Sequence, residues 1–186
     1  MNTLYIDTHL FDINIILFNN KKVIKKKEIK NEKKNSQYLM PSIIEVCDGN
    51  QIDEIVVITG PGSFTGVRLG VTIAKTFAYV KNIPIKAITF FDAMIASLDN
   101  KDVIFGINDN NGYFIAEYHE GRLKKDLFYI SKSDFETYEN KDSVIENVEI
   151  NYEKLIEWLK GVKPINPHIV NPIYIKKIGV ENDKWN

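Results

Sequence analysis

The chain has 186 residues, of which 44% are hydrophobic, and its formal net charge is -1. This apolar content can build the core of one domain or of two small lobes, and the balanced charge excludes a surface devoted as a whole to nucleic acid. Cys47 is the single cysteine, so an intrachain disulfide framework is excluded. No stretch approaches the roughly 20 apolar residues of a membrane span, and the first residues lack a signal-peptide pattern. The interpretation is a cytoplasmic protein.

The amino-terminal third of the chain predicts a small sheet and a helix. "TLYIDT" (residues 3–8) and "INIILF" (residues 13–18) indicate a hairpin of antiparallel strands. The lysine-rich run from Lys21 to Lys34 predicts an exposed edge strand leading into a loop, and a polybasic RNA contact is the alternative. Residues 36–47 predict a helix, with Asn35 or Ser36 as N-cap and one apolar side made of Leu39, Met40, Ile43, Ile44, Val46 and Cys47.

Strands then alternate with helices, and this alternation predicts parallel strands in a mixed α/β sheet. We expect strands at 54–59 and 83–88 and helices at 65–81 and 90–98. After residue 100 a second antiparallel meander is expected, from "VIFGI", "YFIAEY" and "LKKDLFYI", and a helix over 151–161 follows with Asn151 as N-cap and Gly161 near its C-cap. Two related lobes are therefore predicted, residues 1–100 and 101–186.

The segment "GPGSFTGVRLG" (residues 60–70) holds four of the ten glycines between a predicted strand and a predicted helix. It lacks the lysine and the following hydroxyl of a Walker-type phosphate loop, because Val67 and Arg68 follow Gly66. Its glycine spacing is also one residue too long for a dinucleotide fingerprint. Ser63 or Thr65 is expected to cap the helix, and an anion on the bare amides of the helix N-terminus remains the alternative.

The helix over 65–81 has an unusually wide apolar arc. Small residues recur at every fourth position (Gly66, Gly70, Ala74 and Ala78), bordered by Val67 and Val71, and bulky residues form an adjacent face (Leu69, Ile73, Phe77 and Val80). An ordinary surface helix buries a narrower stripe. The prediction is that the bulky face lies on the sheet and the small stripe packs against another helix, either the one at 36–47 or one from another chain.

Catalytic motifs are sparse. The three histidines (His9, His119 and His168) lie far apart and form no i, i+4 pair that could bind a metal. No histidine is placed by a motif to activate Ser63, and Cys47 falls on the apolar side of its helix. We therefore expect no catalytic residue, no metal site and no cofactor.

Four segments together resemble the TsaB (YeaZ) family: "YIDTH", "SQYLMP", "TGPGSFTGVRLGVTIAKTFAYVKNIPIKAIT" and the terminal "NPIYIKK". The family motif covers Gly60, Pro61, Gly62, Ser63, Phe64, Thr65, Gly66 and Arg68. The resemblance implies an actin-like/Hsp70-type (ASKHA) fold of two related lobes, each with a mixed sheet and helices. The chain departs from the family at the turn "NDNNG" (residues 108–112) and in a shorter second lobe.

The resemblance also implies a non-catalytic role in making N6-threonylcarbamoyladenosine (t6A) at adenosine 37 of tRNAs that read ANN codons. The catalytic sister, TsaD, carries two metal-binding histidines, and Phe90 and Met94 stand at the aligned positions here. The implied partners are a TsaD-type subunit in a heterodimer, a TsaE-type ATPase in a ternary complex, tRNA through that complex, and a homodimer when the chain is alone. The implied partner interface comprises Leu39, Met40, Ile43, Cys47, Gly66, Val67, Gly70, Val71, Ala74 and Ala78.

Two other functions remain as alternatives. The first is an independent actin-fold phosphotransferase, in which Asp7 at the end of the first strand would face a metal-phosphate cleft, although Thr8 and His9 follow it where nucleotide binders of this fold generally have glycine. The second is a peptidase, suggested by an older name of the sister family and disfavoured because the metal ligands are absent.

Overall fold

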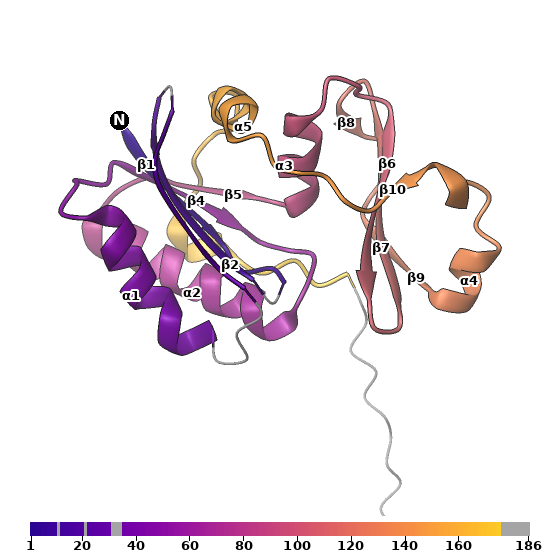
Figure 1. Cartoon of the computed structure of the whole chain (residues 1–186), viewed down its shortest axis with the longest axis horizontal. Coiled ribbons are helices and arrows are strands. Elements are labelled where there is room, and N and C mark those ends of the chain that lie inside the picture. Colours follow the sequence, from indigo (N-terminus) through magenta and orange to yellow (C-terminus); the bar gives the residue numbers. More distant parts are fainter. Residues whose placement is uncertain (11, 21, 31–34, 176–186) are drawn as a thin grey trace, which may run out of the picture.

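The computed structural model of the chain describes residues 1–10, 12–20, 22–30 and 35–175. Two five-stranded sheets lie side by side, with α3 between them (Figure 1). The first sheet has the order β3-β2-β1-β4-β5 and contains β1 (Asn2–Asp7), β2 (Ile13–Asn19), β3 (Val23–Ile29), β4 (Glu54–Ile58) and β5 (Ile85–Ile88). Strands β1, β2 and β3 are antiparallel neighbours, whereas β4 runs parallel to both β1 and β5.

Four helices cover the two faces of this sheet. Alternate residues of a strand point to opposite faces, so β1 sends Leu4 and Ile6 to one side and Tyr5 to the other. The side of Leu4 packs against α1 (Asn35–Cys47) and α2 (Phe64–Lys81). The side of Tyr5 packs against α3 (Phe90–Ser97) and α5 (Tyr152–Leu159). The first sheet is therefore the middle layer of three.

The second sheet repeats the connectivity of the first. It contains β6 (Val103–Asp109), β7 (Gly112–His119), β8 (Arg122–Leu123), β9 (Phe128–Ser131) and β10 (Val144–Ile145). Strand β7 is antiparallel to β6, β9 is antiparallel to β7, and β10 is parallel to β6. The run β9-β7-β6-β10 thus has the same order and directions as β3-β2-β1-β4, as expected for two related lobes.

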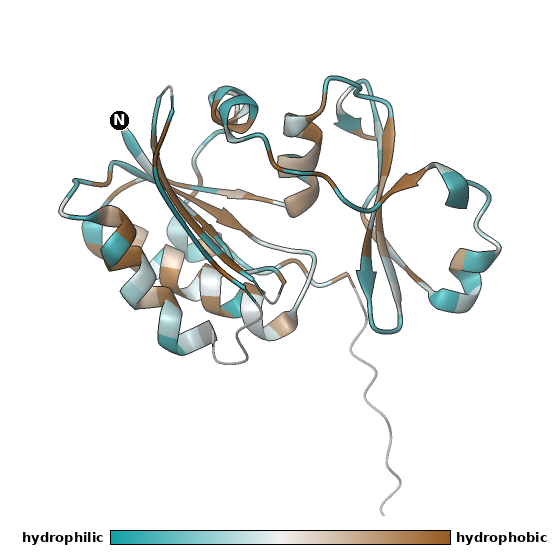
Figure 2. Cartoon of the chain, in the orientation of Figure 1, coloured by the Kyte–Doolittle hydropathy of each residue, from teal (hydrophilic) through white to brown (hydrophobic). Residues whose placement is uncertain are grey.

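Helix α3 joins the two lobes because it is buried on both of its sides. Ala93 and Ala96 face the first sheet, and Phe91, Met94 and Ile95 face the strands of the second. Its N-terminus is closed by a capping box between Thr89 and Asp92. In Figure 2, the strands and α3 are predominantly brown where they meet, as expected for a shared core.

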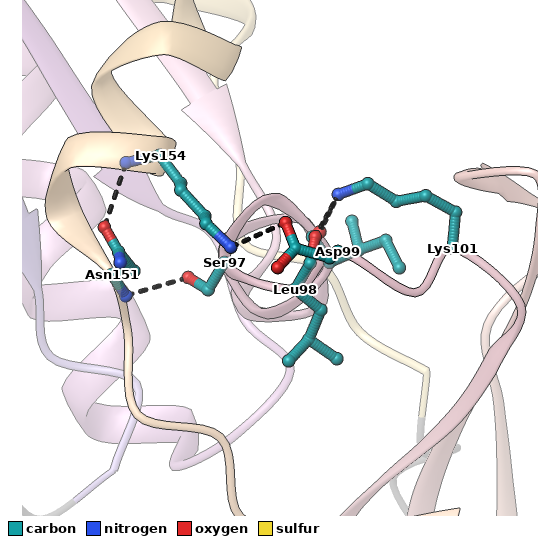
Figure 3. A network of polar contacts seen from close by, with 7 residues as sticks. Ser97, Leu98, Asp99, Lys101, Asn151 and Lys154 are labelled. Carbon is teal, nitrogen blue, oxygen red and sulfur yellow. Dashed lines mark hydrogen bonds and ion pairs between the residues drawn. The ribbon is translucent and has the colours of Figure 1, made fainter.

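The chain after β10 returns to the first lobe. In α5, Lys154 Nζ binds Asp99 at 2.8 Å and the Asn151 amide donates to Ser97 Oγ at 3.0 Å, while Lys101 Nζ donates to the last carbonyls of α3 (Figure 3). Ile165 then bridges Ile85, and Lys75 of α2 donates to the carbonyl of Val170. The predicted boundary near residue 100 stays a prediction, and residues 151–170 pack on the first sheet rather than the second.

Most predicted elements are confirmed within one or two residues, including the edge position of β3 and the Asn151 cap of α5. Lys21 and residues 31–34 of the lysine run lie outside the described residues, as do Lys176 and Lys177 of the terminal motif. The prediction of one strand from Leu123 to Ile130 was wrong, because the structure has two separate strands there, β8 and β9. The short elements α4 (Lys132–Glu136), η1 (Lys141–Ser143), η2 (Pro167–Ile169) and β10 were not predicted.

No helix in the described ranges is long and apolar enough to cross a membrane.

Candidate functional site: the outer surface of α1 and α2

The glycine turn fits tightly against the loop that follows β1. A Cβ atom on Gly66 would lie 2.2 Å from the backbone oxygen of Thr8, and one on Gly70 would lie 2.3 Å from Thr8 Oγ1. Thr8 Oγ1 donates a hydrogen bond to the carbonyl of Gly66 at 2.7 Å. Glycine is therefore required here because another stretch of backbone occupies the space of a side chain.

Two amides of the turn, those of Ser63 and Gly66, already have partners. Ser63 is the N-cap of α2, as predicted, and its hydroxyl accepts from the Gly66 amide at 3.3 Å. The Ser63 amide donates to the carbonyl of His9 at 2.6 Å. A phosphate cradle needs free amides and open space, whereas here the Ser63 and Gly66 amides are bonded and the Thr8–His9 backbone fills the space beside Gly62 and Gly66. The turn shapes the start of α2 and gives no support to the anion-binding alternative.

The predicted assignment of the two faces of α2 was wrong. The small stripe and its borders face inward: Gly66, Val67, Gly70, Val71, Ala74 and Ala78 are all buried within the chain. The bulky residues lie on the flank and outer side, with Leu69, Ile73 and Phe77 half-buried and Val80 70% exposed. The reason is the close approach of Thr8, which only a face without large side chains permits.

Helix α1 is apolar on a narrower side than predicted. Leu39, Ile43 and Val46 are buried against the sheet, and Cys47 is half-buried, where burial raises the pKa of its thiol. Met40 and Ile44 are 39% and 67% exposed and point away from the core. Thus eight of the ten predicted interface residues are buried within the chain: Leu39, Ile43, Gly66, Val67, Gly70, Val71, Ala74 and Ala78. Cys47 is half-buried, and Met40 is exposed.

An apolar groove nevertheless lies between the C-terminal halves of these helices. It has a volume of about 420 Å³, and its walls include Ile44 and Cys47 of α1, Phe77 and Lys81 of α2, and Ile83. Together with Met40 and Val80, the groove forms an apolar outer surface that nothing in the described chain covers. We call these residues the α1/α2 surface. A partner interface on these two helices stays a prediction.

Asp7 does not face open space as the phosphotransferase alternative requires. Its side chain is only 4% exposed, and Oδ1 accepts hydrogen bonds from the amide of His9 at 3.0 Å and from His9 Nδ1 at 2.6 Å. The His9 ring stacks on Phe90 with ring centroids 3.8 Å apart. Burial first and the Asp7 carboxylate second raise the pKa of the Tyr5 hydroxyl well above its usual value. The aspartate is thus held inside the lobe junction, where a magnesium-bound phosphate has no access.

The resemblance aligns Phe90 and Met94 with metal ligands of the sister family, and these two side chains are half-buried and buried respectively. Met94 is completely buried in the core between α3 and the second sheet, and Phe90 packs on His9. Within residues 1–10, 12–20, 22–30 and 35–175, no three His, Cys, Asp or Glu side chains gather in a group that could hold a metal ion.

The architecture defines the class of the protein. Its two lobes share one strand arrangement, β3-β2-β1-β4 in the first sheet and β9-β7-β6-β10 in the second, and this is the actin-like ATPase-domain fold. Solved structures agree, because YeaZ from Pseudomonas aeruginosa superimposes with a TM-score of 0.70 at 16% identity, covering 93% of this chain and 99% of that one.

Sequence comparisons show which proteins the chain is similar to. Residues 26–108 match the family model "TsaD: tRNA N6-adenosine threonylcarbamoyltransferase". The tRNA threonylcarbamoyladenosine biosynthesis protein TsaB of Bacillus subtilis is 38% identical over 102 residues, which are 52% of this chain and 44% of that protein. TsaB of Buchnera aphidicola is 24% identical over 181 residues, covering 82% of each chain. The chain is thus similar to TsaB (YeaZ) proteins, and its match to the B. subtilis protein spans less than half of that relative.

Proposed function

We propose that the chain acts in the biosynthesis of threonylcarbamoyladenosine in tRNA, as a subunit that does no chemistry and binds a TsaD-type catalytic subunit. The names of its relatives supply the pathway. The match of residues 26–108 to the TsaD model is consistent with a pair of sister chains. A TsaE-type ATPase and the tRNA would join through that pair.

The observation that carries the proposal is the exposed α1/α2 surface. Ile44 and Val80 are 67% and 70% exposed, and the groove between the helices is lined mainly by apolar side chains. Contiguous apolar surface of this kind marks protein interfaces. A sister subunit with the same fold can offer two helices of its own, and the four helices would pack with ridges in grooves.

The non-catalytic part of the proposal is supported by the surroundings of the polar groups. Asp7 is buried and bonded to His9, and Met94 stands in the core where the sister chain has a metal ligand. Neither position can bring a reactive group to a substrate in this structure. The transfer chemistry is therefore assigned to the partner.

The test is light scattering after size exclusion, on the chain alone and mixed with the TsaD-type protein of the same source. We expect a one-to-one complex that replaces any homodimer. Ile44→Lys or Val80→Lys should weaken association by at least about a hundredfold, because a charge would be buried in an apolar contact. Ile24→Lys is the matched control, since Ile24 is 44% exposed on edge strand β3.

Two results would contradict the proposal. If both α1/α2 variants bind as tightly as the parent chain, the interface lies elsewhere. If the parent chain does not bind the TsaD-type protein at micromolar concentration, the proposed role as its binding subunit is contradicted. Nucleotide binding by the isolated chain then becomes the next assay.

A further inference from the structure

A second exposed surface lies on the other flank of α2, beside the tail of the chain. The guanidinium carbon of Arg68 lies 3.7 Å from the ring centroid of Phe64 and 5.4 Å from that of Tyr174. Arg68 Nε also donates to the Tyr174 hydroxyl at 2.6 Å. The two rings are 43% and 49% exposed, so a planar cation and two aromatic rings form a stacked group open to solvent. We call Phe64, Arg68, Lys75 and Tyr174 the Arg68 patch.

A hollow of about 250 Å³ adjoins this stacked group. Its walls include Arg68 and Lys75 from α2 and Asn171 and Tyr174 from the tail. Arg68 and Lys75 are seven residues apart, about 10 Å along the helix and on the same side of it. Lys75 donates to the carbonyls of His168 and Val170, which fixes its ammonium at the rim. The hollow therefore has a cation at each end.

The elements that form the patch carry no negative side chain. Helix α2 contains Arg68, Lys75 and Lys81 but no Asp or Glu, and residues 165–175 contain no acidic residue. In the described chain no carboxylate pairs with Arg68, whose terminal amino groups stay available. This local excess of positive charge contrasts with the overall net charge of -1.

We propose that the Arg68 patch binds single-stranded RNA, with a base stacked on Phe64 and Tyr174 and a phosphate held between Arg68 and Lys75. Unpaired bases stack on aromatic rings and on guanidinium planes, and lysine and arginine neutralise the phosphates beside them. An acidic peptide would use the cations but has no part that matches the exposed rings. The inference rests on the proposed function only for the identity of the RNA, which would be the tRNA of that pathway.

The test measures the fluorescence anisotropy of a labelled single-stranded RNA titrated with the full chain over a range of salt. Arg68→Gln should weaken binding about tenfold and make the slope of log Kd against log salt smaller by about one. Arg68→Lys should keep the slope and lose the stacking part of the affinity, because lysine has no planar face. Phe64→Ala should weaken binding about tenfold without changing the slope. Lys163→Gln is the control, since it removes one exposed positive charge from a residue outside the patch.

The outcomes separate this inference from the proposed function. Absence of RNA binding by the parent chain, or equal losses in Arg68→Gln and Lys163→Gln, would overturn it, and so would tighter binding of a labelled poly-glutamate peptide at the same residues. Thermal melting of each variant shows whether the fold is kept. The patch variants should still associate with the TsaD-type protein in light scattering. A parent chain that binds RNA but does not associate with that protein would contradict the proposed function alone.

Discussion

The two faces of the first sheet are covered in different ways. On one face, α3 and α5 are held by further parts of the chain, because the second sheet packs on the outer side of α3 and the polar network of Figure 3 ties it to α5. On the other face, α1 and α2 are held by the sheet, by each other, by the Thr8–His9 loop and by the tail. The first pair is internal structure, and the second leaves apolar side chains such as Ile44 exposed.

The largest effect is expected on the α5 face, at the buried ion pair between Lys86 and Glu54. The two side chains are 8% and 5% exposed, their charged atoms are 2.9 Å apart, and Lys86 Nζ also donates to the carbonyl of Leu159 in α5. Lys86→Met leaves the Glu54 charge buried without its partner, and we expect a loss of about 4 kcal/mol in the free energy of unfolding.

Urea denaturation followed by circular dichroism measures this loss. The double variant Lys86→Met with Glu54→Leu is the control, because it removes both charges and should recover most of the stability. A single variant as stable as the parent would mean that the pair does not anchor α5.

A smaller but still large effect is expected on the α2 face from Gly66→Ala. The new Cβ would lie 2.2 Å from the Thr8 carbonyl oxygen, which is backbone and cannot rotate away, so we expect a loss of about 3 kcal/mol. Gly161→Ala makes the same chemical change where the nearest atom is 3.5 Å away and should alter stability by less than about 1 kcal/mol. The melting temperatures of both variants test this prediction. Equal melting temperatures would show that the Thr8 carbonyl leaves room for a Cβ atom at position 66.

The smallest effect concerns the cap that begins α5. Asn151 Oδ1 accepts from the Lys154 amide at 3.0 Å, and Asn151→Ala should cost about 1 kcal/mol. Asn111→Ala, at an exposed turn, is the control. Hydrogen exchange should show faster exchange of the α5 amides in the first variant only, and an unchanged α5 would mean that the tertiary contacts of Leu155 and Leu159 suffice to hold the helix.

Much of the fold follows from local sequence signals. The short apolar runs of β1 and β2, the Ser63 and Asn151 caps, and the edge lysines of β3 all act over a few residues, and each is found where expected. The short strands β8 and β10 could not be foreseen. With two residues each, they exist only because β7 and β6 offer partners, Tyr118 and His119 for β8 and Ile104 and Phe105 for β10.

The candidate interface shows the same division between local and tertiary determinants. The sequence by itself determined that α2 has an apolar arc too wide for one contact, because a helix places every residue at a known angle. Only the tertiary structure decided which part of that arc faces inward. Thr8 lies against Gly66 and Gly70, so the small residues are inside, while Leu69, Ile73 and Phe77 are half-buried and Val80 is exposed. The Arg68 patch depends likewise on Tyr174, which lies 106 residues away in the chain and is brought to α2 by the returning tail.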